Sequence, residues 1–146
     1  MNREEEILVY HGTRGPVADS VKAGEDIIKN IDPLDPGGFN GSLTDKENTA
    51  YDFAQFPPSR QVGGFPGPAV IEYKIPRNLV VDHGVISGYG SSHGFSTRDI
   101  VSPQEVPEKY LTSIGLTREI AIREVQSGHL SFYRIPSKFM TKITRY

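Results

Sequence analysis

Cysteine and tryptophan are absent from this sequence of 146 residues, and methionine occurs only twice. Without cysteine the protein has neither disulfide bonds nor thiol chemistry, and its redox compartment is left undetermined. A run of about 18 apolar residues, long enough to span a bilayer as a helix, is also missing. The sequence therefore gives no reason to expect a membrane as a partner.

The chain has no large excess of charge of either sign. Its 16 Lys and Arg residues stand against 18 Asp and Glu residues, which gives a net charge of −2 and argues against broad affinity for nucleic acid or anionic membranes. The first six residues are acidic, whereas a secretory signal begins with basic residues. We expect a soluble protein that acts in the cytoplasm or is delivered into a target cell. Met1 is equally compatible with the start of a fragment of a longer protein.

The residues that are abundant describe a loop-rich globular protein. Hydrophobic residues make up 36% of the chain, which also has 15 glycines and 11 prolines. The length fits one domain, over residues 1–146, with one substantial core. Residues 69–75 alternate apolar and polar side chains and predict a strand with one solvated face. Further strands are expected at residues 7–10, 79–81, 119–125, 130–135 and 139–144.

Helices are expected to be few and short. A proline near its start and Gly24 after its end delimit a helix over residues 16–23. A second helix follows Thr44, which forms the pattern of a capping box with Glu47 three residues later. Residues 82–97 are rich in glycine and serine and predict a long loop. These patterns predict an α+β protein dominated by antiparallel strands, with two or three short helices.

Three short motifs follow one another along the chain. His11-Gly12-Thr13 ends the first predicted strand and puts a hydrogen-bonding side chain beside backbone that a ligand can approach closely. Residues 38–44 (Gly-Phe-Asn-Gly-Ser-Leu-Thr) open the helix that contains Tyr51. Residues 118–122 (Arg-Glu-Ile-Ala-Ile) open a late predicted strand. Each motif alone is weak, and the signal lies in their order and spacing.

In this order the motifs resemble those of the ADP-ribosyltransferase-like superfamily, especially its diphtheria-toxin-like, poly(ADP-ribose) polymerase-like and bacterial polymorphic-toxin branches. The resemblance covers residues 7–144. It implies a compact split antiparallel β-sheet core, NAD as co-substrate and no metal. It further implies transfer of ADP-ribose to a macromolecular acceptor by a bacterial toxin or effector. A cognate inhibitor or immunity protein is a partner that such a toxin can have.

The resemblance also implies which residues bind NAD. His11 would bind the nicotinamide-side ribose, and the backbone of Gly12 would hold the carboxamide. Tyr51 would stack against the nicotinamide ring or simply pack in the fold. Polymerase-like members carry a tyrosine at the position of Ser42, whereas serine there resembles the arginine-type toxin branch, so the acceptor is left open. The full set of implied NAD-binding residues is His11, Gly12, Thr13, Ser42, Thr44 and Tyr51.

Glu119 stands where the family places its catalytic glutamate. Cleavage of the nicotinamide–ribose bond creates an oxocarbenium-like cation, and a carboxylate that accepts a hydrogen bond from the ribose 2′-hydroxyl offsets the charge. At about 4 Å and an effective dielectric near 20 the attraction is about 4 kcal/mol, or roughly a thousandfold in rate. The residues alone equally fit a solvated carboxylate paired with Arg118 or Arg123. Glu105 and Glu124 are the competing candidates.

Other functions stay open at this stage. One is NAD hydrolysis by a glycohydrolase toxin, in which water replaces the acceptor. An NAD-dependent RNA 2′-phosphotransferase is another, although such enzymes use several basic residues and few lie near His11 in the sequence. A third is a catalytically inactive binding module of the same fold. Nothing like a strand–elbow–helix surrounds a serine near His83 or His93, and the scattered histidines do not have the spacing of metal ligands.

Overall fold

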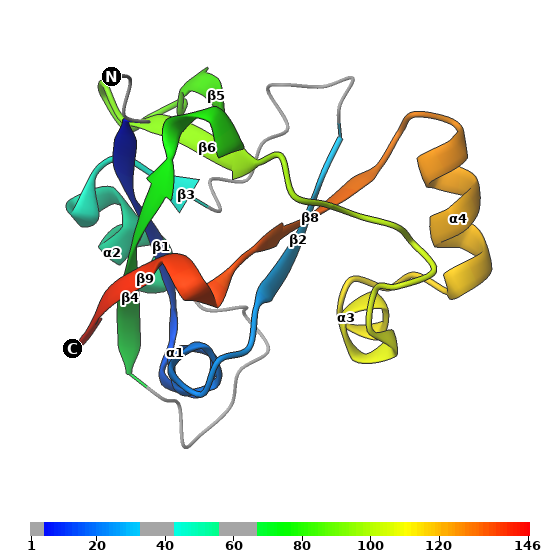
Figure 1. The fold of residues 1–146 in the computed structure, drawn as a ribbon, viewed down its shortest axis with the longest axis horizontal. Helices are drawn as coiled ribbons and strands as arrows, with labels where there is room; N and C mark the ends of the chain where they lie inside the picture. The colour runs from blue at the N-terminus through cyan, green and yellow to red at the C-terminus, as the bar shows by residue number, and fades with distance from the viewer. Residues whose placement is uncertain (1–4, 33–42, 56–66) are drawn as a thin grey trace.

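The computed structural model describes residues 5–32, 43–55 and 67–146, and within these ranges nine strands form two antiparallel sheets with four short helices (Figure 1). The α+β class is thus confirmed, with more helices than predicted. The six-stranded sheet has the spatial order β5 (Val80–Val85), β6 (His93–Thr97), β3 (Leu43–Thr44), β1 (Glu6–Arg14), β4 (Pro68–Pro76) and β9 (Met140–Arg145). The three-stranded sheet has the order β2 (Ile27–Ile31), β8 (Ser131–Ile135) and β7 (Ile100–Val101). The helices are α1 (Gly15–Lys22), α2 (Glu47–Gln55), α3 (Glu108–Ser113) and α4 (Arg118–Gln126).

β1 and β4 form the centre of the six-stranded sheet, and all nine residues of β1 pair with β4. On β4 the side chains of Ile71, Tyr73 and Ile75 are buried, whereas Lys74 is exposed. The alternation in the sequence therefore predicted this strand and its buried face correctly. The buried side chains join Val9 of β1 in the larger of two hydrophobic clusters.

The two faces of β1 carry different helices. Ala18 and Val21 of α1 are buried in the same cluster as Val9, so α1 covers the face to which the odd-numbered residues of β1 point. Gly12 points to the opposite face, where its Cα lies against the backbone of α2. A Cβ atom built on Gly12 would overlap the carbonyl oxygen of Ala50. Gly12 is therefore required for packing, whatever else it does.

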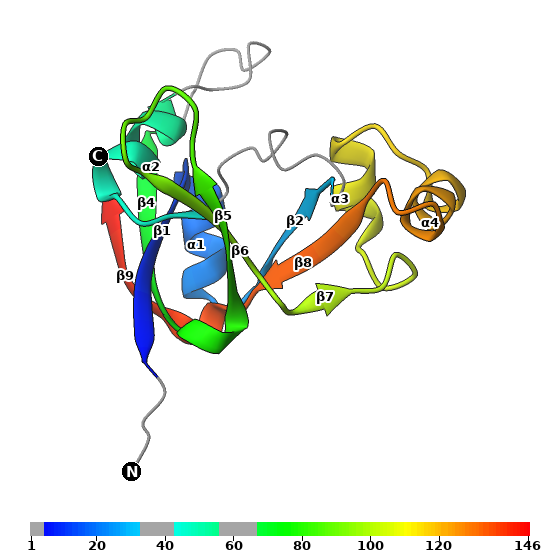
Figure 2. The same ribbon diagram turned by 90° about the horizontal axis from the view of Figure 1, so that it is seen from above.

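The smaller sheet has its own core, beneath α3 and α4. This second cluster consists of Val101, Val106, Leu111, Ala121 and Phe132. Figure 2 shows the three-stranded sheet set off from the larger one, with α3 and α4 on its far side. The two sheets meet where the Thr97 hydroxyl at the end of β6 donates a 2.6 Å hydrogen bond to the Arg134 carbonyl of β8.

Residues 119–125 were expected to form a strand, and this prediction is wrong because they lie in α4. The Thr117 side chain caps the helix, its Oγ1 accepting a 3.2 Å hydrogen bond from the Ile120 amide. Glu119 occupies the first turn, where a carboxylate is favourable at the positive end of the helix dipole. Ala121 is the buried residue of this helix. The apolar residues around it had suggested strand alternation.

Residues 82–97 were predicted to be a long loop, but most of them belong to the β5–β6 hairpin. The tip of the hairpin is attached to α2. Thr49 Oγ1 and Ser92 Oγ are 2.6 Å apart, and the rings of Phe53 and Tyr89 have centroids 5.0 Å apart. The glycine and serine residues lie largely in the connection 86–92, which the Ile86 amide closes by a 2.7 Å hydrogen bond to the Ser92 carbonyl.

The start of α2 also differs from the expectation, and one strand was not expected. Thr44 is not the N-cap of α2: it lies in β3, its Oγ1 accepts a 3.4 Å hydrogen bond from the Lys46 amide, and the helix starts at Glu47. The strand β2 was not predicted at all. The helix expected at residues 16–23 is confirmed as α1, with Gly24 following at a φ of 102°. None of the described helices is long or apolar enough to cross a membrane.

Substitution of Gly12 by alanine tests the contact between β1 and α2. Because the added Cβ would overlap backbone rather than a flexible side chain, the helix must shift, and we expect a loss of about 3 kcal/mol in the free energy of unfolding. Urea denaturation would measure it. Gly24→Ala is the control: its positive φ costs about 1 kcal/mol, but nothing lies within 4 Å of the new Cβ. Equal losses in the two variants would contradict the packing role of Gly12.

Candidate functional site

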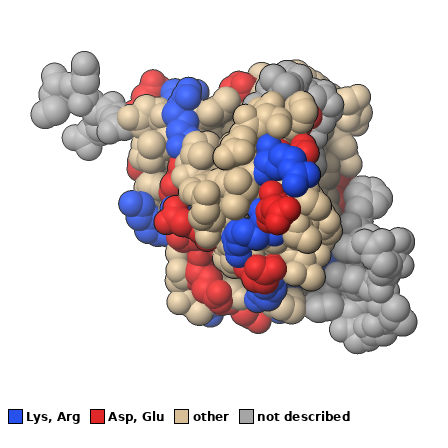
Figure 3. All heavy atoms as spheres, turned by 90° about the vertical axis from the view of Figure 1, so that its right-hand side faces the viewer, with Lys and Arg blue, Asp and Glu red and all other residues tan. Residues whose placement is uncertain are grey.

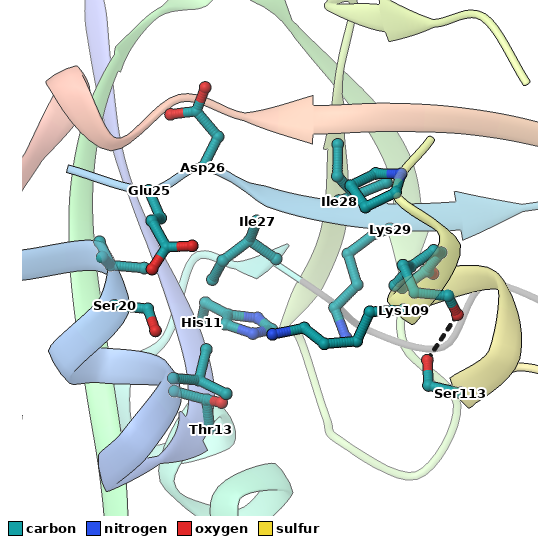
Figure 4. A pocket seen from close by; sticks show the side chains of 14 residues that line it. His11, Thr13, Ser20, Glu25, Asp26, Ile27, Ile28, Lys29, Lys109 and Ser113 are labelled. Atoms are coloured by element: carbon teal, nitrogen blue, oxygen red, sulfur yellow. Dashed lines mark hydrogen bonds between the residues drawn. The ribbon is translucent and has the colours of Figure 1, made fainter. Parts of the chain in front are cut away.

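A cavity of about 560 Å³ lies between the two sheets, with β1 and α1 on one side and β2 and α3 on the other (Figure 4). Its volume is in the range of small-molecule sites, about 300–1,000 Å³. Apolar side chains form much of the wall. The groups that could recognise a ligand are His11, Thr13, Glu25, Lys29 and Lys109.

His11 and Thr13 reach this cavity because they alternate with Gly12 along β1. Gly12 faces α2, so its two neighbours point to the other side of the sheet, toward α1 and β2. His11 is only 5% exposed, yet its ring lines the cavity. Its nitrogens can donate or accept a hydrogen bond according to the tautomer. Of the residues in the first sequence motif, two side chains therefore share one cavity.

Two lysines from distant elements point toward His11 (Figure 4). Lys29 comes from β2 and is half-buried, and burial lowers the pKa of its amine. Lys109 comes from the first turn of α3 and is exposed. In the part of the chain that the structure describes, no carboxylate oxygen lies within 4.0 Å of either amine. Sequence reasoning missed both lysines, since it did not predict β2 and nothing in the sequence relates position 29 to position 109.

Two carboxylates stand at the edge of the cavity, and they differ in orientation. Asp26 points away from His11 (Figure 4). Its Oδ1 accepts a 2.8 Å hydrogen bond from the Ser137 amide, and its Oδ2 lies 3.5 Å from Arg134 Nε. Glu25 instead directs its carboxylate toward the side of the cavity where His11 lies. Glu25 is thus the acidic side chain that could act on a ligand held by His11.

The α3 side of the cavity is held to β2 by a hydrogen bond between side chains. The Tyr110 hydroxyl donates to Asn30 Oδ1 at 2.6 Å. The Ser113 hydroxyl in turn donates to the Tyr110 carbonyl at 2.6 Å. Burial raises the pKa of Tyr110 to about 12, so the phenol stays protonated and keeps donating at neutral pH. This bond fixes the distance between the elements that carry the two lysines.

Thr44 and Tyr51, the described residues of the second sequence motif and its helix, do not line this cavity. Thr44 is buried in β3 opposite Tyr10. Tyr51 lies on α2, on the other face of the sheet, where its ring packs against Tyr146 with centroids 4.4 Å apart. Ser42 lies outside the described residues, as do residues 38–41 of the same motif.

Glu119 lies on the surface that carries α3 and α4. Its side chain is 86% exposed, and its Oε1 is 3.5 Å from Arg123 Nη2. Figure 3 shows that acidic and basic side chains alternate on this face. The competing carboxylates do not line the cavity either: Glu124 pairs with His129 at 3.4 Å, and Glu105 is an exposed turn residue. Glu119 was expected at the start of a strand, and this is wrong because it lies in the first turn of α4.

A second group of polar residues lies on the β5–β6 hairpin. His83 Nε2 is 2.7 Å from Ser96 Oγ, and burial lowers the pKa of His83 although Asp82 opposes this. The Asp82 carboxylate, however, is bonded to His93 Nδ1 at 2.9 Å. Asp82 thus orients His93, whereas the hydroxyl of Ser96 is bonded to His83. Among the described residues no cluster of three or more His, Asp or Glu could hold a metal ion.

Comparisons with protein-family models, with curated proteins and with solved structures gave no significant match. The site is therefore interpreted from its own geometry.

Lys29 should reduce the stability of the protein without ligand. Its pKa in the folded state is lowered from 10.5, so the buried charge costs most below the folded pKa, and the cost falls as pH rises through it. We expect Lys29→Met to raise the free energy of unfolding at pH 7, by an amount that shrinks toward pH 10.5. Chemical denaturation at several pH values measures this, with the exposed Lys22→Met as control. A gain independent of pH would contradict it.

Proposed function

We propose that this protein binds NAD in the cavity around His11, cleaves the nicotinamide–ribose bond and transfers ADP-ribose to a macromolecular acceptor. One observation carries the proposal: the buried His11 of β1 opens into a cavity that also holds amines and a carboxylate. The order of the sequence motifs suggests the same ligand. The proposed fold is the split-sheet fold of the ADP-ribosyltransferase-like superfamily, and the proposed setting is that of a toxin or effector.

The binding mode follows from the side chains on the wall. An imidazole nitrogen of His11 would hydrogen-bond a ribose hydroxyl, with Thr13 next to it on the same face of β1. The backbone of Gly12 can take part as well. Among the described residues, β1 pairs with β3 at Tyr10. Beyond this position β1 continues through residues 11–14. A nicotinamide amide could therefore bond along this edge of the strand.

The reaction needs a negative group beside the ribose. As the C1′–N bond breaks, its electron pair leaves with neutral nicotinamide and positive charge develops on the ribose. An oxygen or nitrogen atom of the acceptor then bonds to C1′ and loses its proton; in hydrolysis, water does so. Glu25 is exposed at the rim of the described cavity and points toward the His11 side. It takes precedence over Glu119, which lies on α4 and does not line the cavity.

Free nicotinamide is the product that tests the proposal. The protein is incubated with NAD and a whole-cell lysate, and the lysate is analysed after separate protease and nuclease digestion. With label on the adenylate part of NAD, nicotinamide release with labelled protein or nucleic acid supports transfer. Release without labelling supports the glycohydrolase alternative. Absence of release contradicts both and leaves a binding module.

The two candidate glutamates give opposite expectations. Glu25→Gln keeps the shape and removes the charge, so nicotinamide release should fall by two to three powers of ten, as about 4 kcal/mol of lost attraction requires. Glu119→Gln should stay within about twofold of the parent protein, because its side chain lies on α4 and does not line the cavity. The opposite result would restore Glu119 as the catalytic residue. Far-ultraviolet circular dichroism of both variants checks that the fold is kept.

His11→Ala should weaken NAD binding through one lost hydrogen bond, about 1.5 kcal/mol or roughly tenfold in the apparent Michaelis constant. Steady-state kinetics of nicotinamide release measures this. His129→Ala, at an exposed histidine beside α4, is the matched control and should change nothing. Since His11 is buried, thermal unfolding is recorded in parallel. A variant that is destabilised but keeps the parent Michaelis constant would assign His11 to packing alone.

A further inference from the structure

The cavity holds positive charge that no described acidic group neutralises. Lys29 and Lys109 both point toward His11 (Figure 4), and neither has a carboxylate within 4.0 Å among the described residues. Lys29 is half-buried, and desolvation lowers its pKa. An amine held away from water without a counter-ion is costly, and an anionic ligand would remove the cost.

The carboxylates nearby do not serve as counter-ions for these lysines. Asp26 is bonded to the Ser137 amide and lies beside Arg134. Glu25 stands across His11 from the two amines (Figure 4). The cavity is thus polarised, with amines on the β2 and α3 side and a carboxylate on the other.

The position of the lysines also suits a flexible ligand. Lys29 is fixed on a strand in the wall, whereas Lys109 is exposed at the start of α3 and can close onto a bound group. The bond between Tyr110 and Asn30 keeps α3 against β2, so both amines stay on one side of the cavity. Two amines on one side match a group with two adjacent negative charges.

We infer that Lys29 and Lys109 form a subsite for the diphosphate of a nucleotide, one amine for each phosphate. The inference rests on the proposed function, because NAD is the ligand expected in the cavity. It adds which side chains bind the diphosphate of that ligand. The lysines would orient the nucleotide across the cavity, with the ribose to be cleaved at His11. They are positioning residues and take no part in bond breaking.

Binding measurements with ADP and adenosine, which carry no nicotinamide, test the subsite apart from catalysis. By isothermal titration calorimetry, ADP should bind at least tenfold more tightly than adenosine, and the difference should shrink as salt rises. Lys29→Met and Lys109→Met should each reduce ADP affinity about tenfold and leave adenosine affinity within twofold. Lys29→Arg should retain most of the ADP affinity. Lys22→Met, on α1 outside the cavity, should match the parent protein.

The outcomes separate the subsite from the proposed function. Equal affinity for ADP and adenosine, or full ADP affinity in both methionine variants, overturns the subsite even if NAD is cleaved. Lysine-dependent ADP binding without nicotinamide release supports the subsite and contradicts NAD cleavage. Circular dichroism shows whether a methionine variant is unfolded. If it is, the ADP affinity of the arginine variant at the same position and the salt dependence of ADP binding by the parent protein decide whether the subsite exists.

Discussion

The contact between α2 and the backbone of β1 at Gly12 fixes much of this structure. A helix can lie this close to the sheet because position 12 has no Cβ, and the pleat then sends the neighbouring side chains to the other face. His11 and Thr13 reach the cavity for this reason. One missing methyl group thus determines both how the large sheet is covered and which side chains a ligand can meet.

The cavity depends on the division of the core into two clusters. The smaller sheet contributes to both clusters, since Tyr133 and Ile135 of β8 belong to the larger one and Phe132 to the second. The cavity opens beside them and is lined in part by Val21 of the larger cluster. Polar groups such as Lys29 can remain there without disrupting either core. A polar group that lowers the free energy of unfolding at such a position is typical of a ligand-binding site.

The sequence was most informative where one face of an element is buried. The alternation on β4 predicted the strand and its inward side chains, and proline and glycine delimited α1. It failed for α4, where Ala121 is the buried residue and the isoleucines around it imitate strand alternation; the N-cap Thr117 was the signal for a helix. His11 and Thr13 were identified from local sequence, but Lys109 approaches them only through tertiary packing, which no local pattern encodes.

The pairing of β2 with β8 joins residues a hundred or more positions apart, from Ile31 with Ser131 to Ile27 with Ile135. During synthesis β2 emerges before its described strand partner, which is completed only when residues 131–135 follow. The wall that carries Lys29 is therefore completed late, after β1 and β4 have already been able to pair. A nascent chain would therefore lack the assembled cavity until residues 131–135 have been synthesised and have paired with β2.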